Sequence, residues 1–285
     1  MGMVINAGNE KKNPKVIWNY LKYKFRFASE HPDYFDADGL LVFVGSQGTG
    51  KTLSAVNYVY KLMNLYPNCK LVTNLMLRDY RIVTFSEFKD YQEQKDTIEF
   101  MKNAGMSESD IDKKLHDYYL RVNRIFPFEN NEDFTLYSNG EYGVIFLVDE
   151  IQLYMNSLES KNINIEVITQ IAQQRKQRKH IVTTSQVFGR MAKPLREQFS
   201  NVVVCRNILG FIQINSLIDR DGLDNDTSTD TSITGKIRKH FFWFHDPKMY
   251  GRYDTYYVIE RNKFVSGENR KGDIYDGNSK PASNN

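Results

Sequence analysis

GLLVFVGSQGTGKT, residues 39–52, joins an apolar run to a glycine-rich turn and ends on a lysine and a threonine. A continuous apolar run that ends in glycine is typical of a strand buried on both faces of a parallel sheet. Residues 45–52 match the pattern G-x-x-x-x-G-K-[ST], and residues 52–65 have the spacing of a helix. A strand, turn and helix in this order predict a phosphate-binding loop; the alternative is a purely structural turn.

The residue types of this loop each have a chemical reason. A polyphosphate needs many donors at short range, so the loop must curl with its backbone N–H groups pointing inward, which glycine permits. Lys51 supplies an ammonium for the β- and γ-phosphates, and the Thr52 hydroxyl can ligate Mg²⁺. We therefore expect ATP and Mg²⁺ as cofactors, with ATP bound by Gly45, Ser46, Gln47, Gly48, Thr49, Gly50, Lys51 and Thr52.

An acidic pair, Asp149 and Glu150, follows a second fully apolar run, Val144 to Val148. An aspartate at the carboxyl end of such a strand is placed to hold Mg²⁺ together with Thr52. The adjacent glutamate is placed to orient and polarise an attacking water, so the pair favours hydrolysis over phosphate transfer by a kinase. The alternative is that Asp149 caps the next helix and Glu150 is merely solvated.

A basic stretch surrounds the next predicted strand, residues 180–185. Residues 167–196 contain seven Lys or Arg and no Asp or Glu. Four bases directly precede the strand, Arg175, Lys176, Arg178 and Lys179, and we expect at least one of them to act as an arginine finger that reaches a neighbouring subunit's phosphates. Gln186 ends the strand and could contact the γ-phosphate or the attacking water. The alternative for the bases is a solvated helix end, and a DNA contact is also open.

The chain divides by composition into three parts. Residues 1–38 form a basic and aromatic helical segment whose aromatic face we expect to dock on the core. Residues 39–264 form an ATPase domain with a helical insertion at 86–125 and a mobile acidic loop at 219–234, and residues 265–285 form a disordered tail. Strands alternate with helices and β-rich runs follow. Together with the phosphate-binding loop this predicts an α/β fold of the P-loop NTPase class, a mostly parallel sheet flanked by helices with antiparallel edge strands.

Composition excludes several classes of protein. With 41% hydrophobic and 26% charged residues the chain is neither a disordered protein nor a fibrous rod. The net charge of +3 neither identifies nor excludes a nucleic-acid partner, because a sum hides local patches. Cys69 and Cys205 lie in apolar runs and are expected as buried thiols. No apolar run approaches the roughly 20 residues of a membrane span, so we expect none and place the protein in the cytoplasm.

Five segments resemble the zonula occludens toxin (Zot)-type phage ATPases of the HerA–FtsK superfamily. They are Val44 to Val56, Leu71 to Leu75, Val148 to Glu150, Arg178 to Gln186, and Tyr253 to Thr255. The resemblance covers roughly residues 39–257. It implies a P-loop NTPase fold of the RecA/ASCE type and an ATP-driven homo-oligomeric ring, a pentamer or hexamer, that moves double-stranded DNA in the host cytoplasm. The resemblance also makes Arg178, and then Arg175, the candidates for the arginine finger. Filamentous-phage members usually carry a membrane span after the ATPase domain, and this chain has none, so genome packaging at a capsid portal or connector fits better than extrusion.

The expected function is therefore ATP-driven translocation of double-stranded DNA during phage genome packaging. An alternative is a phage assembly factor that uses nucleotide as a switch and does not translocate DNA. A nucleoside or other small-molecule kinase is a second alternative, in which the insertion at 86–125 would hold a lid. Asp149 and Glu150 argue against both, because neither function needs a residue that activates water.

Overall fold

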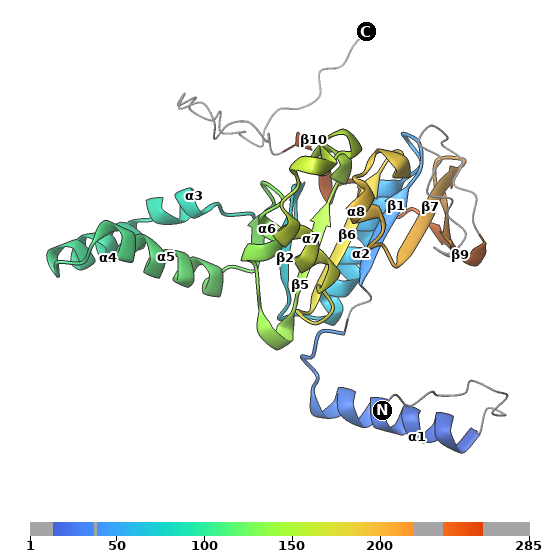
Figure 1. The fold of residues 1–285 in the computed structure, drawn as a ribbon, viewed down its shortest axis with the longest axis horizontal. Coiled ribbons are helices and arrows are strands. Elements are labelled where there is room, and N and C mark those ends of the chain that lie inside the picture. Colours follow the sequence, from blue (N-terminus) through green and yellow to red (C-terminus); the bar gives the residue numbers. More distant parts are fainter. Residues whose placement is uncertain (1–13, 37–38, 219–235, 259–285) are drawn as a thin grey trace, which may run out of the picture.

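The computed structural model describes residues 14–36, 39–218 and 236–258. Its centre is an eight-stranded sheet in the order β4-β2-β5-β6-β1-β7-β8-β9 (Figure 1). In that order the strands span Ile125–Pro127, Lys70–Thr73, Val144–Val148, Lys179–Ser185, Leu40–Val44, Asn201–Ile208, Ile212–Ile218 and Ile237–Phe244. The first six strands are parallel, and β8 and β9 are antiparallel additions at one edge. A second small sheet pairs β3 (Leu75–Leu77) with β10 (Tyr253–Val258).

The strand order confirms the predicted fold class. β6 pairs with β1, which leads into the glycine-rich loop, and with β5, which ends at the acidic pair. A strand inserted between these two is the arrangement of RecA/ASCE-type P-loop NTPases. The carboxyl ends of β1, β5 and β6 therefore meet at one edge of the sheet, where ligands bind in open parallel sheets.

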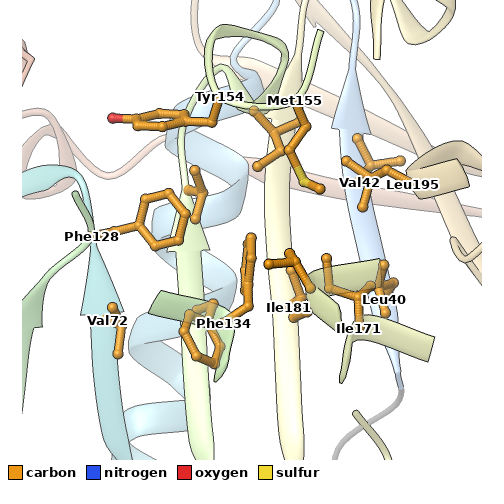
Figure 2. Packing of buried hydrophobic residues seen from close by; sticks show 14 of the residues in the cluster. Leu40, Val42, Val72, Phe128, Phe134, Tyr154, Met155, Ile171, Ile181 and Leu195 are labelled. Carbon is orange, nitrogen blue, oxygen red and sulfur yellow. The ribbon is translucent and has the colours of Figure 1, made fainter. Parts of the chain in front are cut away.

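Helices cover both faces of the sheet. The helices are α1 (Pro14–Glu30), α2 (Lys51–Leu65), α3 (Phe85–Asp90), α4 (Gln92–Asn103), α5 (Glu108–Val122), α6 (Asp133–Leu136), α7 (Ile165–Ala172), α8 (Lys193–Arg196) and α9 (Pro247–Tyr250). Residues of α2 pack with Leu41 and Phe43 on one face. Residues of α6, α7 and α8 pack with Leu40 and Val42 on the other, because successive strand residues point to opposite faces. Figure 2 shows part of this second cluster, with Phe128, Phe134 and Ile181 gathered over one face of the sheet.

Both cysteines are buried and unpaired, as expected from their apolar surroundings. The charged segment between β3 and β4 forms the helices α3, α4 and α5, which project together from the body of the molecule (Figure 1). No helix within the described residues is apolar over a sufficient length to span a bilayer. The acidic loop at 219–234 and the tail at 265–285 lie outside the described residues.

One expectation about the amino-terminal helix is wrong. Trp18, Tyr23 and Phe25 on α1 are 60%, 63% and 75% exposed, so these aromatic side chains do not dock on the core. Figure 1 shows α1 apart from the sheet. Helical periodicity identifies an amphipathic face but says nothing about which surface covers it.

Candidate functional site

The glycine-rich loop between β1 and α2 has the curled backbone that its sequence predicts. Gly48 and Gly50 have φ values of 79° and 78°, a left-handed conformation that other residues adopt at a cost. The loop closes on Ser46, whose carbonyl accepts hydrogen bonds from the Thr49 N–H at 3.4 Å and the Thr49 hydroxyl at 2.8 Å. Since Gly50 is the N-cap of the 15-residue helix α2, the loop lies where the positive end of the helix dipole meets a ligand.

Lys51 is buried although it carries a charge. The residue is only 6% exposed, and its Nζ donates a hydrogen bond to the Ser46 carbonyl at 3.1 Å. The acceptor belongs to the same loop that would hold the phosphates. The ammonium therefore lies within the loop and can exchange this carbonyl for phosphate oxygens when a triphosphate enters.

Asp149 is held at the end of β5 from three sides. Its Oδ1 accepts hydrogen bonds from the hydroxyls of Thr52 at 2.8 Å and Thr184 at 2.7 Å. Asn74, at the end of β2, accepts from the Asp149 N–H at 2.8 Å and donates to the Asp149 carbonyl at 2.9 Å. Burial raises the pKa of the Asp149 carboxyl, and the two hydroxyl hydrogen bonds oppose that shift.

This arrangement fits a magnesium ion. A hard divalent cation prefers oxygen ligands, and the Thr52 hydroxyl and Asp149 carboxylate lie in contact beside the phosphate loop. A cation there would also offset the cost of a buried carboxylate charge. Thr52 and Asp149 are therefore the residues that would hold Mg²⁺, and their role as its ligands stays a prediction.

Glu150 has an unusual backbone conformation that directs its side chain. Its φ is 51° and its ψ is 54°, a left-handed conformation that costs a non-glycine residue on the order of 1 kcal/mol. Its N–H donates to the Thr184 hydroxyl at 2.9 Å, which helps to hold this geometry. The carboxylate accepts hydrogen bonds from the amides of Gln152 and of Gln186, the latter at 3.2 Å. Two neutral amides fix the direction of the carboxylate without neutralising its charge.

Sequence reasoning placed Asp149, Glu150 and Gln186 together, and the structure brings them together. The sequence alone predicted no role for Thr184 or Asn74. Thr184 could have been found, because the predicted pairing of β5 with β6 puts the penultimate residue of one strand beside the end of the other. Asn74 lies in the segment Leu71 to Leu75, which resembles the family, and no rule of spacing links it to Asp149.

Arg175 and Arg178 lie at the opposite edge of the sheet from the phosphate loop. They precede β6, whereas Gln186 follows it, so Arg178 and Gln186 are about 25 Å apart along the strand. The Arg178 guanidinium lies 3.8 Å from the centre of the Tyr34 ring and is 3.5 Å from the Glu141 carbonyl. Neither arginine joins the site of its own chain, and a role as a finger in a neighbouring subunit stays a prediction.

The basic stretch is not one patch in three dimensions. Strand β6 divides it, leaving Arg175 and Lys176 exposed at one edge of the sheet and Arg190 and Lys193 exposed at the other. Lys179 is 4% exposed, and its Nζ donates to the Phe134 carbonyl at 2.7 Å. A run of charges along the chain therefore gives two separate surfaces and one structural lysine.

Comparison with known proteins gives one family. Residues 40–251 match the family model described as zonular occludens toxin (Zot). No curated protein sequence matches the chain. Among solved structures, the N-terminal domain of zonular occludens toxin from Neisseria meningitidis is similar at 15% identity and a TM-score of 0.45, over 77% of this chain and 100% of that one.

A second similar structure is the genome packaging NTPase B204 from Sulfolobus turreted icosahedral virus 2, in complex with ATP-gammaS. Its identity is 10% and its TM-score 0.41, over 74% of this chain and 98% of that one. Both TM-scores lie below 0.5, and the fold class rests on the strand order and loop geometry of this chain itself.

Proposed function

The chain belongs to the zonular occludens toxin (Zot) family, and from this premise we propose that it is an ATP-hydrolysing motor. We propose further that it assembles as a homo-oligomeric ring and translocates double-stranded DNA, in packaging a phage genome through a capsid portal. The observation that carries hydrolysis is the Glu150 carboxylate, which two amides hold. Glu150 directly follows Asp149, which contacts Thr52 at the end of the phosphate loop.

The residues of the site divide the chemistry among them. The loop N–H groups and Lys51 would bind the triphosphate, and Thr52 with Asp149 would hold Mg²⁺. When bound, this ion would supply charge neutralisation at the β- and γ-phosphates. Glu150 would accept a hydrogen bond from the attacking water and align it, with the Gln186 amide fixing the direction of the carboxylate.

The ring is supported by what the site lacks. In the described part of the chain, no arginine is among the side chains that hydrogen-bond to the carboxylates of Asp149 and Glu150. Charge that develops on the transferred phosphate calls for a further cation. Arg178 and Arg175 lie at the far edge of the sheet, where they are available to the site of a neighbouring subunit rather than to their own.

The DNA partner is supported by basic side chains beside the site. Arg190 and Lys193 are exposed just beyond the carboxyl end of β6, the strand that Gln186 follows directly. Phosphate contacts there would lie close in the chain to the residue that contacts Glu150. Movement linked to hydrolysis could therefore reach a DNA-binding surface over a few residues.

The test measures ATP turnover with and without double-stranded DNA at two salt concentrations. DNA should stimulate turnover, and the stimulation should fade as salt rises, because phosphate contacts release counterions. Glu150→Gln should retain ATP binding and lose turnover on the order of 10³-fold. Turnover that ignores DNA would rule out translocation. Near-zero turnover with intact ATP binding would instead favour a nucleotide-switched assembly factor.

A further inference from the structure

A buried glutamine on β8 contacts the phosphate loop. Gln213 is fully buried, and its Nε2 donates a hydrogen bond to the Thr49 carbonyl at 2.9 Å. Gly50 lies so close that a Cβ built on it would be 2.2 Å from Gln213 Oε1. Glycine at position 50 is therefore required for packing against this amide, in addition to its left-handed φ.

Gln213 is also connected, through the side chain of Asn215, to the helix α2 that follows the loop. Gln213 Nε2 donates a second hydrogen bond to Asn215 Oδ1 at 2.9 Å, and that oxygen accepts from the Ser54 hydroxyl on α2 at 3.3 Å. Strand β8 thus holds the loop and the first turn of α2 together. A valine or isoleucine would fill a buried strand position without making these contacts.

The direction of the hydrogen bonds beyond Gln213 follows from the Thr49 contact. A backbone carbonyl can only accept, so Gln213 must direct its NH₂ group towards Thr49 and its Oε1 towards His245 Nε2, at 3.1 Å. His245 Nε2 must therefore carry a hydrogen. Its Nδ1 lies 2.5 Å from the Tyr250 hydroxyl, which lies 3.1 Å from the Gly210 carbonyl in the turn between β7 and β8.

These contacts form one continuous polar chain from Thr49 through Gln213 and His245 to Tyr250, which is 51% exposed. We propose that Gln213 is a positioning residue that holds the phosphate loop in its binding conformation, and that His245 fixes Gln213 in turn. The inference rests on the ATP binding of the proposed function. It adds that loop geometry is set from the antiparallel edge of the sheet, through residues that touch no nucleotide.

The first test replaces Gln213 with methionine, which has similar length and no amide. Loss of the Thr49 contact should raise the KM for ATP and the Kd of a fluorescent ATP analogue about tenfold, with kcat unchanged, because the loop binds ground state and transition state alike. A glutamine that merely stabilised the fold would instead give a lower melting temperature and fewer active molecules, at an unchanged KM. That result would overturn the inference.

The second test uses a matched pair of histidines and stands even if Gln213→Met does not fold. His245→Phe removes the donor to Gln213, and we expect a rise of about threefold in the ATP Kd. His240→Phe, on β9, removes a comparable contact of 2.9 Å to Ser216, which does not bind the loop. His240→Phe should leave the Kd unchanged, and equal effects of the two variants would overturn the role of His245.

The proposed ATP binding and the proposed role of Gln213 can be disproved separately. If the wild-type protein showed no Lys51-dependent binding of ATP, the proposed function would be wrong, and the inference with it. If the wild type bound ATP and Gln213→Met bound it equally well, the inference alone would be wrong.

Discussion

Two buried lysines serve different purposes at the two ends of the parallel strands, which are called here the carboxyl edge and the amino edge of the sheet. Lys51 is 6% exposed at the carboxyl edge, and Lys179 is 4% exposed at the amino end of β6. Each ammonium donates to a backbone carbonyl, Lys51 to Ser46 in the glycine-rich loop and Lys179 to Phe134 in α6. Burial lowers the pKa of Lys179. Burial of a charged side chain therefore does not identify a functional site by itself. The location of the carbonyl that accepts its hydrogen bond distinguishes the two lysines.

The rest of the two edges follows the same division. At the amino edge, Arg124 donates to the carbonyls of Met63, Tyr66 and Cys69 at 2.8, 3.2 and 3.0 Å, so its charge is used to satisfy backbone. At the carboxyl edge, hydroxyls and amides hold the acidic pair. The first edge uses cations to complete the fold, whereas the second holds its charged groups in place for a ligand.

The largest expected effect comes from removing the lysine of the carboxyl edge. Lys51→Ala should reduce ATP turnover on the order of 10³-fold or more, because no other cation in the described site reaches the loop. Its melting temperature without nucleotide should stay close to that of the wild type, since the Ser46 carbonyl lies in a partly exposed loop. If Lys51→Ala retained its ATP turnover, Lys51 would not be a functional lysine and would not differ in role from Lys179. The measurement is steady-state ATPase together with thermal unfolding.

The next effect asks whether the amino edge contributes to catalysis in a neighbouring subunit. Arg178→Ala should leave ATP binding intact and lower turnover of the assembled ring on the order of 10²-fold. Tyr34→Leu, which removes the stacked ring and keeps the charge, is the control for a change in local packing. Arg175→Ala tests the second candidate.

Mixed rings make that prediction sharper. A subunit with Arg178→Ala has an intact site, and a subunit with Lys51→Ala has an intact arginine. If the finger acts between subunits, mixing the two inactive proteins should restore part of the turnover. Wild-type turnover by assembled Arg178→Ala alone would show that the finger assignment is wrong.

The sequence allowed the fold to be predicted where local pattern and topology agree. The apolar runs at β1, β5 and β6 and the glycine-rich loop led to a mostly parallel sheet with the acidic pair and Gln186 beside the phosphate loop. These predictions succeed because carboxyl ends of parallel strands share one edge.

Other features could not be predicted, because they depend on contacts distant in the sequence. Gln213 lies 164 residues from Thr49, and nothing in the β8 sequence marks it as a partner of the loop. The basic stretch is continuous in sequence, but strand β6 separates its ends into two surfaces. The face of α1 was expected to be covered, since periodicity reports an amphipathic helix without its partner.

A smaller effect tests the structural lysine. Lys179→Met should lower the free energy of unfolding by about 2 kcal/mol, because the Phe134 carbonyl loses its donor in a buried place. The KM for ATP and the turnover per folded molecule should match the wild type, in contrast to Lys51→Ala. Chemical denaturation monitored by circular dichroism gives the first quantity, and ATPase assays give the others. A selective loss of turnover would mean that the two edges are coupled.

The smallest effect is a pH dependence of stability in the same structural region. Asp133 precedes Phe134 and accepts hydrogen bonds from the N–H groups of Glu129 at 2.6 Å and Asn130 at 3.1 Å. Burial raises the pKa of its carboxyl to about 6, the two hydrogen bonds oppose this, and Glu129 and Glu132 add to it. The folded protein therefore binds this proton more tightly than the unfolded chain does.

Because the folded pKa is the higher one, the stabilisation from this proton is fully present only at low pH. The free energy of unfolding of the wild type should fall by about 1 to 2 kcal/mol as the pH rises from about 4.5 to about 7, and this contribution should level off above that. Asp133→Asn should remove this part of the slope, whereas Glu132→Gln, at an exposed position, should retain it. The same slope in wild type and Asp133→Asn would assign the titration to another group and leave the amino edge without a pH-sensitive carboxyl.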